Sequence, residues 1–416
     1  MGVWLLVPEH LRLQTWNLLR GWTDRPTEHL DPRLALQMVH EAALCVTGVR
    51  ERAALPLKTF EQAVGLPFVA TDQAIHELLN AHTIEDAQKV QVALGQIRRT
   101  LGHFRGELLA IDPHRMRSYS KRHMRLRQDK RDGTPWKCGQ TFFCIDVETQ
   151  QPIAFTTGTP GRTATQATPE LFRLVADILN PTGARPLVLA DTEHRSAELF
   201  EHTFHETPFD LVTPMSRQKG VYETIAALPP ECFTPHWAGY ATAVRPYRFL
   251  NGQTDLFQLI QRCGERPEEF QYKAFASTRH DETVEILTGH YPKRWNAEVF
   301  FNNHQALGWK RAGTLNLHIR YGKMTMSLLA QAALHQLRQR LGEPYCCYEA
   351  SHFANEVLGG LDGDVRVRRD TIVVTLYNAP DSLRPHYENL PDKLEAEGVD
   401  PRIPWLFDFK LNFRFT

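Results

Sequence analysis

The stretch from residue 106 to residue 214 limits the folds open to this chain more than any other part of the sequence. Three short apolar runs come first, an amphipathic helix follows, and two further apolar runs alternate with a second helix. A strand that returns to its own sheet after a helix does so by a right-handed crossover. The sequence therefore predicts an α/β core with a mixed sheet in the order β-β-β-α-β-α-β.

Local signals set the bounds of these elements. Thr168 is a good N-cap and Pro169 suits a first helical position, whereas Asn180-Pro181 ends a helix. Between them runs one apolar stripe of Leu171, Leu174, Val175, Ile178 and Leu179. The expected strands are 108–111, 142–145, 152–155, 186–190 and 209–212, with a second helix over 196–204.

The chain divides into five segments. They are a helical domain (1–105), the first part of the core (106–214), a β-rich insertion (215–286), the second part of the core with a long helical signature (287–342), and a small C-terminal α+β segment with a strand over 371–377 (343–416). The N-terminal domain has two interpretations. It is either a DNA-binding domain of the helix-turn-helix kind or a packing or dimerisation module.

Three carboxylates stand where an active site can form. Asp112 and Asp191 each follow an apolar run, and in this element order the two strand ends are neighbours. Glu298 lies on a later helix that can pack against the same sheet edge, and Glu193 and His194 lie beside Asp191 to hold it in place. Carboxylates are the ligands that Mg²⁺ prefers, and two ions roughly 3.5–4 Å apart activate the attacking oxygen and stabilise the leaving one in phosphoryl transfer. The sequence predicts a site for two Mg²⁺ ions, with Mn²⁺ as a substitute.

Each acid also has a chemically silent interpretation. Asp112 precedes a proline and suits a turn, Asp191 suits the cap of the next helix, and Glu298 suits a solvated helix face. Asp146, in the second strand, competes for a ligand position. The coincidence of three acids with the right element order favours the metal site.

The segment 291–298 carries the most specific motif. Its spacing resembles the Y-x2-R-x3-E signature of insertion-sequence DDE transposases, a family with an RNase H-like core. In that family a lysine follows the glutamate after six intervening residues, and Gln305 stands there in this chain. Lys310 and Arg311 are the cations that can take its place.

The resemblance extends over about residues 106–341. The runs that end at Asp112 and Asp191 resemble the strands carrying the family's two aspartates, and residues 215–286 stand where the family has its β-rich insertion. The resemblance implies a DNA transposase that cleaves DNA at transposon ends and transfers the freed strand into target DNA. It also implies double-stranded DNA with terminal inverted repeats as the partner, and a homodimer that acts on two ends.

Two alternatives stay open. A domesticated, catalytically silent DNA-binding protein would keep the fold, and Gln305 favours it. A RNase H-like nuclease without strand transfer would use the same metal chemistry.

The net charge of zero, from 48 basic and 48 acidic residues, hides two basic segments. Residues 101–140 hold ten Lys and Arg against four acids, and residues 293–323 hold six against Glu298 alone. Such segments suit phosphate contacts, and a solvated basic loop is the alternative. The expected DNA contacts are Tyr291, Arg294, Trp295, Lys310, Arg311, Arg115, Arg117, Lys121, Arg122, Arg125 and Arg127. Trp295 and Trp237 suit either stacking on bases or, as the favoured interpretation, core packing.

The class of protein follows from what the sequence lacks. No apolar run approaches the ~20 residues that cross a bilayer. The seven cysteines are odd in number and contain no Cys-x-x-Cys. We expect a soluble cytoplasmic protein without a membrane partner, associated with the nucleoid if the source is bacterial.

Overall fold

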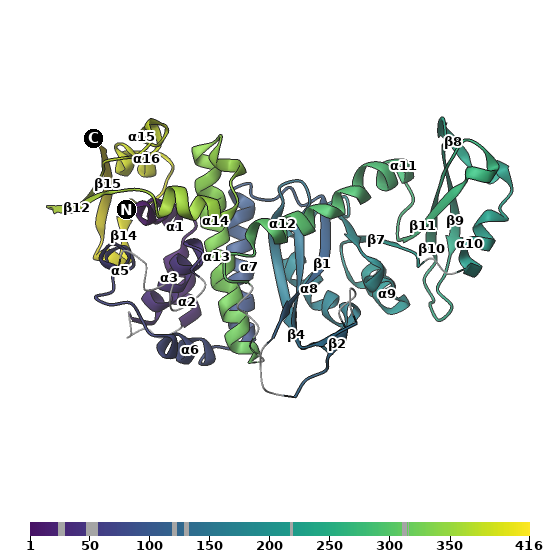
Figure 1. Ribbon diagram of the computed structural model, residues 1–416, viewed down its shortest axis with the longest axis horizontal. Helices are drawn as coiled ribbons and strands as arrows, with labels where there is room; N and C mark the ends of the chain where they lie inside the picture. Colours follow the sequence, from purple (N-terminus) through teal and green to yellow (C-terminus); the bar gives the residue numbers. More distant parts are fainter. Residues whose placement is uncertain are drawn as a thin grey trace. The chain divides into compact units, whose positions relative to one another are not determined.

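The computed structural model describes most of the chain (Figure 1). The described residues are 1–23, 30–46, 57–118, 123–128, 133–216, 219–309, 314 and 316–416. They form two compact units. The first unit comprises Met1–Arg98, Met116–Arg122 and Phe301–Thr416, and the second comprises Arg99–Arg115 and His123–Phe300.

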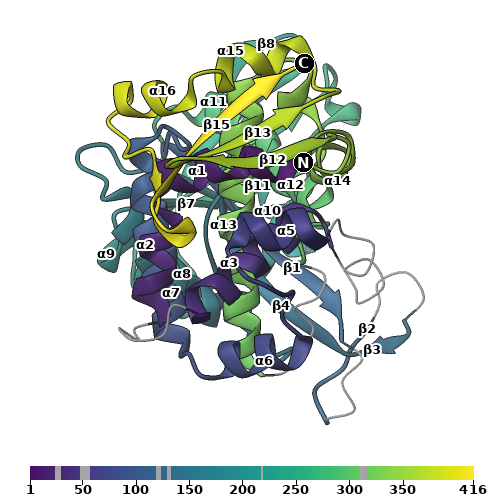
Figure 2. The same cartoon turned by 90° about the vertical axis from the view of Figure 1, so that its left-hand side faces the viewer.

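The first unit joins helices from distant parts of the chain. They are η1 (Gly2–Leu5), α1 (Leu6–Arg12), α2 (Thr15–Thr23), α3 (Leu30–Ala43), α5 (Leu57–Val64), α6 (Asp72–Asn80), α7 (Ile84–Thr100) and α13 (Leu317–Leu341). Figure 2 shows α13 among α3, α5 and α6. Gly322 permits this packing, because a Cβ there would lie 2.4 Å from Cδ2 of Leu79 on α6. The helix α13 was expected with the catalytic core, but it belongs to this unit.

The C-terminal segment adds a small sheet to the first unit. Its elements are α14 (Ala350–Phe353), β12 (Gly363–Arg368), β13 (Thr371–Leu376), α15 (Arg384–Tyr387), α16 (Leu390–Ala396), β14 (Arg402–Ile403) and β15 (Phe409–Phe415). The strands lie in the order β12-β13-β15-β14. Trp405 ties this segment to the N-terminal helices, because its indole Nε1 donates to the Ala63 carbonyl at 2.9 Å.

The second unit is built on one nine-stranded mixed sheet. Its strands are β1 (Leu108–Arg117), β4 (Cys138–Asp146), β5 (Gln151–Gly158), β6 (Leu187–Ala190), β7 (Asp210–Pro214), β8 (Thr234–Trp237), β9 (Tyr240–Tyr247), β10 (Leu256–Cys263) and β11 (Gln271–Ser277). The spatial order is β5-β4-β1-β6-β7-β11-β10-β9-β8. A separate ribbon pairs β2 (Arg127–Gln128) with β3 (Pro135–Trp136). The expected α/β architecture with a large mixed sheet is confirmed.

Strand pairing in the core follows the predicted order of elements. The strands β4 and β5 form an antiparallel hairpin, and β6 runs parallel to both β1 and β7. The crossover helices are α8 (Ala164–Leu179) and α9 (Ala197–Glu206). All four residues of β6 are buried, as the continuous apolar run predicted.

The start of α8 differs from the prediction. Thr163, not Thr168, is the N-cap: its hydroxyl accepts the Gln166 N–H, and the Gln166 side chain accepts the Thr163 N–H. This capping box satisfies two donors at the helix end, whereas the Thr168 hydroxyl donates to the Ala164 carbonyl inside the helix. Pro169 therefore lies within the helix. The predicted end is confirmed, because Asn180 adopts a left-handed conformation with φ 41°.

The insertion continues the core sheet. Its strand β11 pairs antiparallel with β7, and β10, β9 and β8 follow outward. It also contains a helix that the sequence analysis did not predict, α10 (Lys219–Ala226).

The segment after the insertion is helical with changes of pitch. It comprises α11 (Thr283–Glu285), a π turn (Ile286–His290), the 3₁₀ helix η6 (Tyr291–Trp295) and α12 (Asn296–His304). The helical signature expected within 287–342 therefore begins as π and 3₁₀ turns, and the regular α-helix starts at Asn296. Among the described residues, no helix combines the length and apolarity needed to span a membrane.

Candidate active site

Parallel pairing of β1 with β6 brings the two aspartates together. Ile111 pairs with Ala190, and the next residues along the two strands are Asp112 and Asp191. Neighbouring strands lie about 4.8 Å apart, so the two side chains begin one strand spacing from each other. Asp112 was expected at the end of its strand, but β1 continues to Arg117. The strand can continue through Pro113 because its pairing with β6 ends at Ile111. The proline, which has no N–H, therefore removes no hydrogen bond between β1 and β6.

The third carboxylate, Glu298, is linked to Asp112 by an arginine that contacts both. In η6, the Arg294 guanidinium lies 3.3 Å from Asp112 Oδ1 and 3.7 Å from Glu298 Oε1. Tyr291 anchors η6 to the sheet, because its hydroxyl donates to the carbonyl of Ala190, the last residue of β6. The signature residues and the two aspartates therefore meet at one edge of the sheet.

Burial and mutual repulsion act on Asp112. The pKa of Asp112 is raised to about 7, chiefly by burial; Arg294 and Arg115 oppose this shift, and the neighbouring Asp191 and Glu298 add to it. Burial likewise raises the pKa of Tyr291 to about 12. Asp112 therefore lies within electrostatic range of both Asp191 and Glu298.

Asp191 is held from one side. Its Oδ1 accepts the Glu193 N–H at 2.9 Å and lies 2.9 Å from Nδ1 of His194, a ring that is 1% exposed. Burial acts to raise the pKa of Asp191, but these hydrogen bonds outweigh it and lower the pKa. The capping role and the place in the acidic cluster therefore belong to the same side chain, and His194 fixes its orientation.

Asp146 does not join the cluster. Its Oδ2 accepts the backbone N–H groups of Arg105 and Gly106 at 2.8 and 2.7 Å. Its Oδ1 accepts two more backbone N–H groups, from Glu148 and Thr149, and the Thr149 hydroxyl. Both oxygens are used in turns, so the interpretation of Asp146 as a competing ligand is wrong.

Arg115 was expected to contact DNA, but its guanidinium is bound within the protein. It forms an ion pair with Glu193, and its Nε donates to Gln140 Oε1 at 3.0 Å. Gln140 in turn donates to the carbonyls of Thr159 and Arg162. These contacts join β1, just beyond Asp112, to the loop after Asp191. The only sequence signal for them is a glutamine, Gln140, inside a buried strand.

The other expected DNA contacts are only partly described. Arg125 is exposed, Arg127 is half-buried in β2, and Arg117 is exposed and belongs to the first unit. Lys121, Arg122, Lys310 and Arg311 lie outside the described residues.

The two tryptophans are not in the core, so the favoured interpretation of their roles is wrong. Trp295 is 60% exposed and Trp237 is 54% exposed. Trp237 stacks on Tyr240 with ring centroids 4.3 Å apart and planes inclined by 6°. Trp295 lies directly after Arg294 at the end of η6.

The cluster fits divalent metal ions in its donor chemistry. Asp112, Asp191 and Glu298 offer hard carboxylate oxygens, and their combined charge exceeds that of Arg294. Within the described residues, no group of three or more His, Cys, Asp or Glu side chains is already close enough to hold one ion together. Arg294 contacts both Asp112 and Glu298, and its guanidinium offsets part of the negative charge of the cluster.

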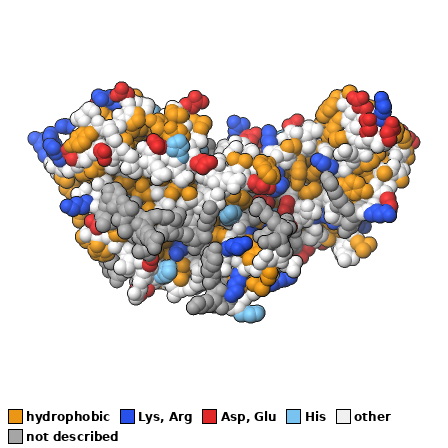
Figure 3. Space-filling view, viewed as in Figure 1, with side chains coloured by type: hydrophobic (Ala, Val, Ile, Leu, Met, Phe, Trp, Pro, Cys, Tyr) orange, Lys and Arg blue, Asp and Glu red, His pale blue; other side chains and the backbone are white. Residues whose placement is uncertain are grey.

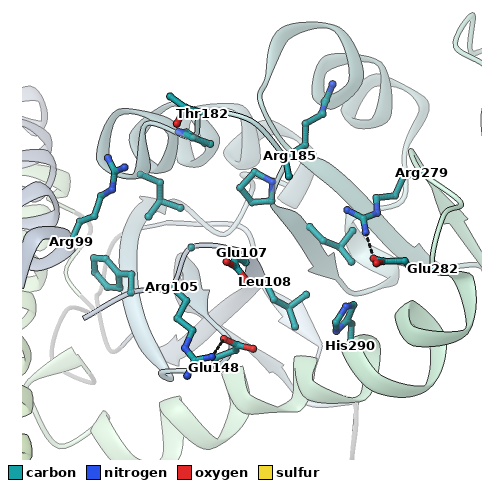
Figure 4. A pocket seen from close by; sticks show the side chains of 17 residues that line it. Arg99, Arg105, Glu107, Leu108, Glu148, Thr182, Arg185, Arg279, Glu282 and His290 are labelled. Atoms are coloured by element: carbon teal, nitrogen blue, oxygen red, sulfur yellow. Dashed lines mark hydrogen bonds and ion pairs between the residues drawn. The ribbon is translucent and has the colours of Figure 1, made fainter. Parts of the chain in front are cut away.

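A pocket of about 630 Å³ lies at the other end of β1 and β6, beside Leu108 and Leu187 (Figure 4). Its charged side chains are largely matched. Arg105 pairs with Glu148 at 2.9 Å, and Arg279 pairs with Glu282 at 2.8 Å. The nearby Arg185 donates to the carbonyls of Thr203, Thr207 and Phe209. These pairings are structural, and the pocket adds no group to the acidic cluster.

A comparison with models of known protein families finds no match, and neither does a search of curated proteins. Solved structures do match. One is the cryo-EM structure of a piggyBac transposase synaptic complex with hairpin DNA, at 11% sequence identity and a TM-score of 0.44, covering 85% of this chain and 79% of that chain. A likeness of this strength fixes neither a shared fold nor an activity.

Proposed function

We propose that this protein is a DDE transposase, which cuts DNA at the ends of a mobile element and joins the freed 3′ end to target DNA. One observation carries the proposal. Asp112, Asp191 and Glu298, which are far apart in sequence, converge at one sheet edge around Arg294. The spacing of Tyr291, Arg294 and Glu298 adds the resemblance to the family's signature.

The strand arrangement supports a RNase H-like core for this function. A hairpin of β5 and β4 lies beside β1, and β6 and β7 follow in parallel. Between the strand of Asp191 and the helix of Glu298 stands the insertion β8–β11. A catalytic centre at the carboxyl ends of parallel strands is the expected place for a ligand in such sheets.

The side chains divide the work. Two Mg²⁺ ions, when bound, would activate the attacking oxygen and stabilise the leaving oxygen of the phosphodiester. Asp112, Asp191 and Glu298 are the residues that would hold them. His194 orients Asp191, and Tyr291 fixes η6 against the sheet. Arg294 offers a guanidinium that can bind a DNA phosphate through two parallel hydrogen bonds.

The partners follow from the reaction. The substrate is double-stranded DNA with the terminal inverted repeats of the element, followed by target DNA. Because two ends must be cut and joined together, the acting form is a homodimer on DNA.

One alternative has an observation in its favour. Gln305 stands where the family signature has a lysine, and its amide donates to the nearby Asn302 carbonyl at 3.5 Å. A protein that keeps the fold and binds DNA without cutting it would tolerate this change.

The deciding experiment incubates the full-length protein with DNA carrying the terminal repeats and with Mg²⁺ or Mn²⁺. We expect nicking at the repeat ends and joined products with a target plasmid. Asp191→Ala should abolish both, and Asp255→Ala, an exposed aspartate of the same unit, should abolish neither. Cleavage without joined products would favour a nuclease, and binding without cleavage would favour the silent DNA-binding protein. Cleavage by Asp191→Ala would refute the site.

A further inference from the structure

The C-terminal sheet has two unlike faces. Residues paired across a ladder share a face, and successive residues of a strand alternate between faces. The registers of β13 with β15 pair Ile372 with Leu411 and Val374 with Phe413. These four side chains are at most 6% exposed. One face of the sheet therefore belongs to the core of the first unit.

The opposite face carries cations from three strands. Arg368 pairs with Thr371, Thr371 with Lys410, and Lys410 with Arg402, so these residues form one row across all four strands. Arg366 and Arg414 lie on the same face, two and four positions along their strands. We call this set, Arg366, Arg368, Arg402, Lys410 and Arg414, the basic face. Arg369 follows it in the turn after β12.

The figures show where this surface lies. The strands β12, β13 and β15 lie side by side in Figure 2. In Figure 3, Lys and Arg side chains gather at the left end, over the strand labelled β12 in Figure 1. Arg366, Arg368, Arg369, Arg402 and Arg414 are all exposed.

Three of the six cations, counting Arg369 with the basic face, have carboxylate partners. Arg366 pairs with Asp364 at 3.1 Å, Arg402 with Asp400 at 2.5 Å, and Lys410 with Glu395 at 3.5 Å. Exposed pairs of this kind contribute little stability, so a polyanion can take over their cations. In the part of the chain that the structure describes, Arg368, Arg369 and Arg414 form no ion pair. Six cations thus stand beside five acids, Asp364, Asp370, Glu395, Asp400 and Asp408, which leaves an excess of one positive charge on this surface. The arginines without an ion pair carry that excess.

We propose that the basic face binds the sugar–phosphate backbone of double-stranded DNA. The partner is the DNA of the proposed function, on which this inference rests. From Arg368 to Arg402 the row crosses three strand spacings, about 14 Å, which is comparable with the roughly 12 Å width of a major groove between its phosphates. The row can thus reach phosphates on both sides of a groove. Arginines on one face of a sheet can contact phosphates and hold the duplex without reading its sequence.

The test measures DNA affinity against salt concentration. The variant is the full-length triple substitution Arg368→Gln, Arg369→Gln and Arg414→Gln, which changes exposed side chains only. Fluorescence anisotropy with a terminal-repeat duplex and with an unrelated duplex gives the slope of log K against log[salt]. Each lost phosphate contact reduces the slope by about 0.9. We expect a reduction of roughly 2 to 3 and the same fractional loss of affinity for both duplexes.

A matched control removes three cations from helices elsewhere, with Lys89→Gln, Arg173→Gln and Lys219→Gln. These residues are 57% or more exposed in their side chains and pair with acids one turn away. The control should keep the wild-type slope. A wild-type slope in the Arg368/Arg369/Arg414 variant would overturn the basic face as a DNA contact and leave the proposed function intact. Wild-type protein that binds neither duplex would overturn both.

Discussion

Each of the two units contains a cluster of carboxylates and arginines, and the two clusters differ in charge balance. In the first unit, Arg12 contacts Glu9 at 3.1 Å and Glu397 at 2.5 Å. Arg340 contacts the same two acids at 2.9 and 3.5 Å. Two positive charges thus meet two negative ones. Glu9 is fully buried, and burial raises its pKa against the opposing effect of the two arginines.

In the second unit the balance is lost. Asp112, Asp191 and Glu298 bring three carboxylates, and Arg294 is the cation that contacts two of them. Arg115 forms an ion pair with Glu193, outside the three carboxylates. His194 supports Asp191, but it is positive only when protonated.

The difference separates a structural network from a binding site. A buried network must be close to neutral, because an unpaired buried charge costs several kcal/mol. In a cluster with surplus negative charge, repulsion between the carboxylates destabilises the fold unless a cation binds. Such clusters mark functional sites. The comparison predicts opposite responses when a charge is removed from each cluster.

The largest effect is expected in the balanced network. Arg12→Met leaves Glu9 buried with one partner fewer and should lower the free energy of unfolding by about 3–5 kcal/mol. Urea unfolding followed by tryptophan fluorescence measures it. The buried indoles of Trp4, Trp22 and Trp405 all belong to this unit, so their exposure to water reports its unfolding.

The control is an exposed arginine–aspartate pair of the same unit. Arg402 pairs with Asp400, and both side chains are more than half exposed. Arg402→Met should lower the free energy of unfolding only slightly, because exposed ion pairs contribute little stability. An equally small cost for Arg12→Met would remove the distinction between the two kinds of pair.

The acidic cluster should respond in the opposite sense. Asp112→Asn removes one of three like charges, so stability should stay constant or rise by about 1 kcal/mol, whereas end cleavage should fall by more than about 100-fold. Urea unfolding followed by circular dichroism and the cleavage rate give the two readouts. Asp255→Asn serves as the control for both. A stability loss as large as that of Arg12→Met would place Asp112 among structural residues.

The meeting of Asp112 with Asp191 was predictable from sequence. Both follow apolar runs, and the order of strands and helices makes their strands neighbours under general topological rules. Local pattern sufficed here because each strand is specified by its own residues. The helix end at Asn180 and the stripe from Leu171 to Leu179 were predictable for the same reason.

Contacts between distant residues were not predictable. The pair Arg115–Glu193 depends on how far β1 extends past Asp112, which the following proline conceals. Because long basic side chains look alike in sequence, Arg115 was assigned to DNA. The exposure of Trp295 depends on the 3₁₀ pitch of η6, which an α-helical period does not reproduce.

Two buried histidines of the first unit, His10 and His40, should make its stability fall at acidic pH. His10 and His40 stack with ring centroids 5.0 Å apart on α1 and α3. Burial lowers the pKa of His10 to about 3 and lowers that of His40 well below its ordinary value, an effect to which His10 adds. In the unfolded chain both titrate near 6.5. Above pH 6.5 both histidines are therefore neutral in the folded and in the unfolded chain. Below pH 6.5 the unfolded chain binds more protons than the folded one, so the free energy of unfolding falls as the pH falls.

The loss should amount to roughly 1–2 kcal/mol per histidine between pH 6.5 and pH 5. His40→Leu should reduce the pH dependence by about half, as measured by urea unfolding at several pH values with tryptophan fluorescence. His318→Leu, at an exposed position of the same unit, should leave it unchanged. A His40→Leu variant with the full wild-type pH dependence would contradict the assignment.

The smallest effect concerns Arg294, the arginine that contacts two acids of the cluster. Arg294 contacts Asp112 and Glu298, so a metal ion bound by these acids must compete with its guanidinium. Arg294→Gln should raise the affinity for Mn²⁺ in the absence of DNA by roughly 5- to 10-fold, the equivalent of about 1–1.4 kcal/mol. Isothermal titration calorimetry measures it without any reaction.

The matched control for this variant is Lys293→Gln, which removes the same charge from an exposed position of the same 3₁₀ helix. It should leave the Mn²⁺ affinity near the wild-type value, because an exposed charge is screened by water and salt. Equal gains in both variants would mean that net charge alone sets the affinity. A gain confined to Arg294→Gln would mean that this guanidinium occupies the acids until metal ions and a DNA phosphate replace its contacts. The acidic cluster would then be balanced by exchangeable cations, whereas the cluster around Glu9 is balanced by permanent ones.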